Sequence, residues 1–204
     1  MALRRSDRDL PALTVLALLL TGPRHTYEMH RLMIDTHKDF VSGLPRSMYH
    51  AVDRLLRAGL IRVEGTDKAA GRPERTVYAL TDAGRAELGV RVGRLLEHPD
   101  PDATLFVAAL SFLGCLPVPD ARAALEVRRA ELARRATAAQ EALAEVSQGV
   151  PRLLLVELEY DIARLAAERD WVTALVADLD SGRLTWPADP TEFLAALPGG
   201  APMT

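Results

Sequence analysis

The stretch LPRSMYHAVDRLLRAGLIRVEGTDKAAGRPERTVYAL, residues 44–80, decides how the rest of the chain can fold. Its first part predicts a helix of about four turns, because Pro45 suits the first helical position and Gly59 suits a left-handed stop. One face of this helix is apolar and is predicted to be buried, whereas the opposite face is polar. The apolar face comprises Met48, Val52, Leu55 and Leu56, and the polar face comprises Arg46, His50, Asp53, Arg54 and Arg57.

A strand-turn-strand pattern follows this helix directly. Residues 61–64 alternate apolar and charged side chains, and residues 76–80 are rich in strand-forming types. A turn-rich stretch with cationic side chains separates them. A helix with an outward cationic face, joined to a hairpin with a cationic tip, is the layout of a winged helix, which reads the DNA major groove and touches the flanking backbone or minor groove. The cations of the tip are Lys68, Arg72 and Arg75.

Several short motifs in and around this stretch occur in a fixed order. They are HTYEM at 25–29, LPRSMY at 44–49, GLI at 59–61, GRP at 71–73 and VYALTDAG at 77–84. In this combination the sequence resembles the PadR family of bacterial transcriptional regulators over roughly residues 10–96. The resemblance implies a winged-helix DNA-binding regulator, a phosphate contact from Tyr27, and dimerisation through a long carboxy-terminal helical segment.

The chain departs from the family pattern at two places. The family commonly has Gly-Thr-Leu-Tyr-Pro where this chain has RSMYH at 46–50, and Thr26 replaces a usual glycine. The operator sequence therefore does not carry over from other members.

The side chains expected to contact DNA lie on the predicted helices and the wing. Arg and His can donate to guanine edges, whereas Ser and Tyr suit phosphates. An ordinary solvated charged face is the alternative interpretation for each of them, and Arg57 is expected to pair with Asp53, four residues before it. The predicted contacts are Tyr27, Arg46, Ser47, Tyr49, His50, Arg54, Lys68, Arg72 and Arg75.

The charge of the chain is unevenly distributed. The 204 residues carry a net charge of −3, which argues against a non-specific nucleic-acid binder. Residues 1–84 nevertheless hold 13 Lys and Arg against 10 Asp and Glu, whereas residues 85–204 hold 12 against 18. A local basic face of this kind is what DNA contact requires.

Other classes of protein lack support in the sequence. There is no nucleophile elbow, phosphate-binding glycine loop or paired-cysteine metal motif, so we expect no enzyme, no cofactor and no metal site. The single cysteine, Cys115, excludes a disulfide within the chain and is expected to be a buried apolar side chain in the reducing cytoplasm. No run is long enough to span a membrane. Asp7 and Asp9 argue against an export signal.

The fold class we predict is mainly α with a small two-stranded β wing. Residues 1–98 are expected to form a winged helix-turn-helix domain, with helices at 11–20, 27–37 and 82–97; Thr26 and Thr81 are the expected caps. The break HPDPD at 98–102 marks the domain boundary. Residues 103–184 then form a helical dimerisation domain, and residues 185–204 form a Pro/Gly-rich tail, loosely ordered except for one possible docking turn at 192–197.

Two long helices, 120–147 and 151–180, carry apolar residues every seven positions and are joined by a short turn. This pattern predicts an antiparallel helical hairpin. Two helices alone make a poor core, so we expect a homodimer that reads a palindromic operator; the alternative is a hairpin folded onto its own winged domain. The residues expected to bury the seam at the dimer interface are Leu125, Leu132, Leu143, Leu158, Leu165, Val172 and Leu179.

A small-molecule effector is the last expectation. Tyr160 and Trp171 on the second long helix could line an apolar effector cavity at the dimer centre, or else belong to interface core. The sequence thus predicts a sequence-specific, dimeric DNA-binding repressor relieved by an effector. The alternative is a winged-helix module that binds protein without specific DNA binding.

Overall fold

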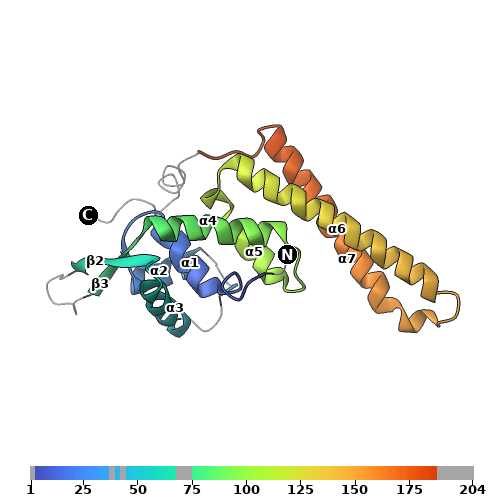
Figure 1. Cartoon of the computed structure of the whole chain (residues 1–204), viewed down its shortest axis with the longest axis horizontal. Helices are drawn as coiled ribbons and strands as arrows, with labels where there is room; N and C mark the ends of the chain where they lie inside the picture. Colours follow the sequence, from blue (N-terminus) through green and yellow to red (C-terminus); the bar gives the residue numbers. More distant parts are fainter. Residues whose placement is uncertain (1–2, 37–39, 42–44, 68–74, 188–204) are drawn as a thin grey trace.

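The computed structural model describes residues 3–36, 40–41, 45–67 and 75–187, and it confirms a mainly helical chain with one small antiparallel sheet (Figure 1). The predicted wing contacts Lys68 and Arg72 and the predicted docking turn at 192–197 lie outside these residues. The helices are α1 (Leu10–Leu19), α2 (Thr26–Asp35), α3 (Arg46–Arg57), α4 (Asp82–Glu97), α5 (Ala103–Ser111), α6 (Val118–Val146) and α7 (Val156–Asp180). The strands are β1 (Arg24–His25), β2 (Ile61–Asp67) and β3 (Arg75–Leu80), and two 3₁₀ turns are η1 (Leu113–Cys115) and η2 (Arg152–Leu154).

The sheet has one more strand than the sequence predicted. Strands β2 and β3 form the expected hairpin, with Ile61 opposite Leu80 and an irregularity between Val63 and Gly65. The short strand β1 pairs with the other edge of β3, which places His25 opposite Val77. A two-residue strand carries no alternating pattern that sequence reasoning could detect.

Helix α3 has the buried face and the end that its sequence predicts, but it begins at Arg46, and Pro45 occupies the cap position instead of the predicted first helical position. Met48, Val52 and Leu55 are buried, and Gly59 adopts the left-handed conformation with φ of 68°, which ends the helix. The chain then enters β2 directly.

The start of α4 depends on a cap and a glycine. Thr81 accepts the backbone N–H of Gly84 at 3.0 Å, as predicted for a cap. A Cβ at Gly84 would lie 2.0 Å from the carbonyl oxygen of Leu60. A larger residue therefore fits only if the backbone segments at Gly84 and Leu60 move apart. Thr81 and Gly84 together hold the start of α4 close to the start of the wing.

The cap of α2 differs from the prediction. Thr26 is the first helical residue and is buried, whereas His25 occupies the cap position with its Nδ1 accepting the N–H of Glu28 at 3.1 Å. The correction has a structural cause: pairing with β3 holds His25 in an extended conformation, which a capping residue needs.

One apolar core runs through the winged part and into the base of the long hairpin. Helix α1 is buried nearly all round, as its apolar sequence predicts, and it packs on α3 and α4. Helix α4 packs in turn on α5 and α6. The buried cluster is continuous across residues 98–102, so the domain boundary predicted there stays a prediction.

Helices α6 and α7 form the predicted antiparallel hairpin, whose far end projects away from the winged part (Figure 1). The apolar seam closes the hairpin on itself and on α4. Of the residues predicted to meet a second copy, Leu143 and Leu158 are half-buried. The other five are already buried within the single chain: Leu125, Leu132, Leu165, Val172 and Leu179.

A buried arginine ties the base of the hairpin to the winged part. Only 2% of Arg128 is exposed. Its Nε donates to Glu168 on α7 at 2.7 Å, and its Nη1 donates to the carbonyl oxygens of Leu95 and Leu96 at 3.3 Å each. The guanidinium lies 3.6 Å from the ring centroid of Phe106 on α5. Burial lowers the pKa of Arg128, and the carboxylate of Glu168 opposes that shift.

Two further features concern α6 and the chain after α7. On the outside of α6, hydrogen bonds from Arg134 and Arg135 lower the pKa of Glu131 to about 2.

After α7, Trp186 is partly buried and its Nε1 donates to the carbonyl oxygen of Leu116 at 2.8 Å. The start of the predicted loose tail is therefore attached to the fold.

Candidate nucleic-acid interface

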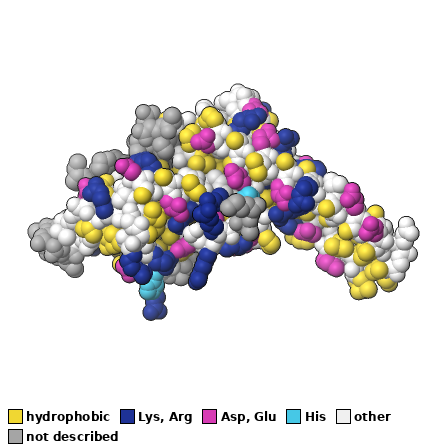
Figure 2. Space-filling model, viewed as in Figure 1, with side chains coloured by type: hydrophobic (Ala, Val, Ile, Leu, Met, Phe, Trp, Pro, Cys, Tyr) yellow, Lys and Arg dark blue, Asp and Glu magenta, His cyan; other side chains and the backbone are white. Residues whose placement is uncertain are grey.

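The outward face of α3 presents the polar side chains that its sequence predicts. Arg46, Tyr49 and His50 are exposed, and Ser47 is half-buried beside them. Burial of the opposite face orients this set. In Figure 2, Lys and Arg side chains gather together with a histidine along the lower edge of the winged part, on the side where Figure 1 draws α3. The helix therefore offers donors for base edges and phosphates on one side.

Arg54 is tied to α1 in the absence of DNA. Its Nε and Nη2 donate to both carboxylate oxygens of Asp9, at 3.0, 2.9 and 2.7 Å. Asp9 also caps α1 by accepting the N–H of Ala12 at 3.2 Å. A bidentate pair of this kind fixes the guanidinium and neutralises its charge. Arg54, a predicted DNA contact, therefore also positions α3 against α1.

Arg57 does not pair as expected. Its Nε donates to the backbone carbonyl oxygen of Asp53 at 3.2 Å, whereas the sequence predicted a bond to the carboxylate. The bond keeps the arginine close to its own helix.

A second cluster forms where the wing meets α2, from residues that are distant in the sequence. Tyr27, at the start of α2, is 55% exposed. The guanidinium of Arg75, at the start of β3, lies 5.1 Å from the centroid of the Tyr27 ring. The ring of His25 stacks on Tyr27 at 6.1 Å. Strand β1 creates this group by placing His25 beside β3.

A nitrogen of Arg75 and a nitrogen of His25 lie close together, but neither can accept a hydrogen bond from the other. Nη1 of Arg75 lies 3.4 Å from Nε2 of His25. Because Nδ1 of His25 accepts the N–H of Glu28, the proton of the neutral ring belongs on Nε2. Two donors then face the same space, and one anionic oxygen could accept from both. Sequence reasoning singled out Tyr27 and Arg75 but missed His25, whose role needs the unpredicted strand.

The remaining sequence expectations lie elsewhere in the molecule. Trp171 is half-exposed and its ring lies perpendicular to that of Phe106, with 6.1 Å between the centroids. Tyr160 is exposed nearer the start of α7. Within the described residues no cluster of His, Cys, Asp and Glu could hold a metal ion. None of the helices in the described part is long and apolar enough to cross a membrane.

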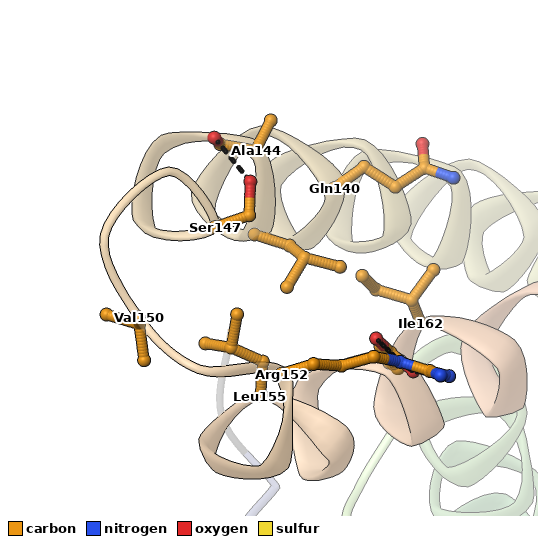
Figure 3. Close-up of a pocket in the computed structure, with 9 residues that line it drawn as sticks. Gln140, Ala144, Ser147, Val150, Arg152, Leu155 and Ile162 are labelled. Atoms are coloured by element: carbon orange, nitrogen blue, oxygen red, sulfur yellow. Dashed lines mark hydrogen bonds and ion pairs between the residues drawn. The ribbon is translucent and has the colours of Figure 1, made fainter.

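The far end of the hairpin carries a contiguous apolar surface, visible in Figure 2 at the tip that points away from the winged part. Beside it a pocket of about 670 Å³ opens between the end of α6 and η2, with Ile162 and Leu155 directed into it (Figure 3). We call the exposed apolar residues the hairpin-end surface: Val146, Val150, Leu153, Leu154, Val156 and Tyr160.

Comparison with known proteins agrees with the predicted resemblance. Residues 15–90, from α1 into α4, match the family model described as "Transcriptional regulator PadR-like family". A comparison with curated proteins gave no match.

The chain is also similar to solved structures. PadR from Bacillus subtilis in complex with operator DNA is 20% identical, with 82% of this chain and 98% of that chain covered and a TM-score of 0.41. The same protein in complex with p-coumaric acid is 17% identical, with coverage of 84% and 99% and a TM-score of 0.38. A PadR-like transcriptional regulator from Bacillus cereus is 15% identical, with coverage of 84% and 99% and a TM-score of 0.37.

Proposed function

Residues 15–90 match the model of the PadR-like family of transcriptional regulators, and from this premise we propose that the chain is a sequence-specific DNA-binding repressor of the cytoplasm. The observation that carries the proposal is the exposed polar face of α3, together with the cluster of His25, Tyr27 and Arg75, within a segment that matches this family. Helix α3 enters the major groove, and the second cluster holds a backbone phosphate of the flanking DNA.

The overall charge of the chain fits binding through a local patch. A chain with a net charge of −3 gains little from non-specific attraction to DNA. Specific contacts from α3 must then supply a larger share of the affinity, and phosphate contacts set the register.

We also propose that two copies assemble through the hairpin-end surface. A contiguous apolar surface of this kind is unfavourable in water and marks an interaction site. A symmetric dimer carries two recognition helices and therefore suits a palindromic operator. Because most of the heptad seam is buried within one chain, the exposed Leu153 and Leu154 replace it as the central contacts. Changing both to Asp is expected to give a folded monomer in light scattering.

Relief by a small-molecule effector forms a separate proposal. Trp171 lies half-exposed on Phe106, a core residue that also contacts the buried guanidinium of Arg128. A planar apolar ligand stacked on this tryptophan would shift the ring of Phe106 and so disturb the contacts of Arg128 between the hairpin and α4. The chain has a second tryptophan, Trp186, so the test is quenching of Trp171 fluorescence in a Trp186→Phe variant, together with release of bound DNA. Ligands that quench without releasing DNA would refute the regulatory step.

The main experiment is a salt-titrated binding assay with DNA from just upstream of the protein's own gene, in excess non-specific competitor. We expect saturable binding that weakens steeply with salt. Arg75→Ala is expected to weaken binding to all sequences and to reduce the salt slope by about one, whereas His50→Ala is expected to relax base preference. Arg169→Ala is the matched control, because Arg169 is an exposed arginine on α7 that pairs with its neighbour Asp170.

One outcome would favour a different function. A folded dimer that binds no DNA at low salt would move the assignment to a winged-helix module that binds protein. Binding that is unchanged by both Arg75→Ala and His50→Ala would leave a DNA-binding protein but would remove the proposed interface.

A further inference from the structure

A groove runs along α4 on the side that faces the start of α6. It has a volume of about 600 Å³ and is lined by residues of α4, η1 and the first turns of α6. Three small residues of α4 are among those that line it: Ala86, Gly89 and Gly93. An ideal Cβ at Gly89 would lie 3.7 Å from a methyl group of Leu116, so the glycine leaves the groove open beside that leucine. Val90 at its edge is 45% exposed.

We propose that residues 191–197 of this chain, TEFLAAL, dock in the α4 groove. The chain is led there by Trp186, whose Nε1 donates to the carbonyl oxygen of Leu116, a residue that itself lines the groove. Residues 188–204 lie beyond the described part of the chain, so the segment begins only five residues after this attachment point.

The segment has apolar side chains that can pack on the small and apolar residues of the groove. Phe193, Leu194 and Leu197 are spaced so that one short helical turn places them on the same side. Pro190 and Pro198 bracket the segment, and a proline at each end limits it to about two turns. An aromatic ring can approach a glycine closely, because no Cβ stands in the way.

The length of chain is sufficient. Seven residues separate Trp186 from Phe193, and an extended chain of that length reaches at most about 23 Å. The stretch of α4 from Arg85 to Glu97 that lines the groove is about 18 Å long. The segment can therefore reach either end of the groove from Leu116.

Charge selects the direction along α4. Arg85 lines one end of the groove and has no ion-pair partner among the residues that the structure describes, whereas Glu97 lines the other end. Arg94 and Asp120 also line the groove, and Arg94 lies 3.5 Å from the carboxylate of Asp7. The segment and its approach carry Asp189 and Glu192. Acidic residues favour the end at Arg85 and are repelled from the end at Glu97.

Docking has a structural consequence that is independent of DNA binding. The groove is shared between α4, which continues from the wing, and the start of α6, which begins the hairpin. A segment that fills it bridges these two helices and fixes the angle between them. Docking in the α4 groove can therefore be tested without DNA, and its outcome does not depend on the proposed function.

Cys115 provides a direct probe, because it is the only cysteine of the chain and it lines the groove. In the full chain we would measure how fast Cys115 reacts with a small maleimide. Replacing Phe193, Leu194 and Leu197 together by Ser is expected to speed the reaction several-fold, and Met203→Ser, outside the segment, is expected to leave it unchanged. Circular dichroism confirms that both variants remain folded. Equal rates in the wild type and the triple variant would overturn the proposal.

A crosslink tests the position independently of any protection. Leu194→Cys is expected to form a disulfide with Cys115 inside one chain on mild oxidation, because a disulfide requires Cα atoms within about 7 Å. Met203→Cys is the control and is expected to crosslink poorly. A covalent dimer in place of the intrachain product, or equal crosslinking at both positions, would refute docking within the chain.

Discussion

The buried arginine at the base of the hairpin provides the strongest stability prediction. Replacing Arg128 by Ala leaves the carboxylate of Glu168 and the carbonyl oxygens of Leu95 and Leu96 without the donor that they have in the structure. It also leaves a cavity over the ring of Phe106. Breaking a buried ion pair on one side costs about 3–5 kcal/mol. Glu168 keeps a second arginine, Arg164, 3.8 Å away, so we expect the lower value, about 3 kcal/mol.

The assay is thermal and urea unfolding followed by circular dichroism at pH 7. For a chain of this size, a loss of about 3 kcal/mol corresponds to a decrease in Tm of roughly 6–12 °C. Arg129→Ala is the matched control: this neighbouring arginine is exposed and pairs with Glu126 at 2.7 Å, a surface bond that contributes about 1 kcal/mol or less. Arg128→Lys is expected to fall between the two, because an ammonium lacks the planar fork.

The result that would refute this reasoning is a loss for Arg128→Ala no larger than that for Arg129→Ala. Such a result would mean that the hairpin base is held by apolar packing alone. A large loss with an unchanged urea m-value would instead support a native state that keeps its compactness and loses one interaction.

Three further predictions concern other contacts. Gly84→Ala is expected to cost about 1–3 kcal/mol in urea unfolding, because the new Cβ would collide with the carbonyl oxygen of Leu60; an unchanged midpoint would contradict the packing argument. Glu131→Gln is expected to reduce stability slightly at pH 7. Since the folded-state pKa is lowered to about 2, this difference should shrink as the pH falls from about 4.5 towards 2; a difference that grows on acidification would reverse the sign. Asp9→Asn is expected to release the charge of Arg54 and to steepen the salt dependence of DNA binding by about one, measured by fluorescence anisotropy; an unchanged slope would show that Arg54 does not meet DNA.

Local signals in the sequence predicted the elements of the winged part well. Gly59 ends α3 because glycine, which has no Cβ, adopts the left-handed backbone conformation without steric strain. Thr81 caps α4 because its hydroxyl accepts the backbone N–H of the residue three positions later. Both effects act within a few residues, and a reader of the sequence can find them. The alternation of apolar and polar residues likewise identified the buried face of α3.

Contacts between distant residues could not be predicted in the same way. The cluster of His25 and Arg75 joins residues 50 positions apart, and the pair of Arg54 and Asp9 joins residues 45 positions apart. Each depends on how helices and strands pack, which single-sequence patterns do not specify. The heptad stripes show the same limit: they predicted that Leu132 and Val172 would be buried, but not that their own chain would bury them.

Arg128 lies at the base of a long hairpin, so a small rotation there displaces the far end by a large distance. From Arg128 to the end of α6 at Val146 there are 18 residues, or about 27 Å of helix. A rotation of about 10° about the arginine moves the far end by roughly 5 Å, about one helical turn. In an assembly joined at that end, the displacement passes to the other chain. In the dimer proposed above, a rotation of that size at the buried ion pair would change the separation of the two α3 helices.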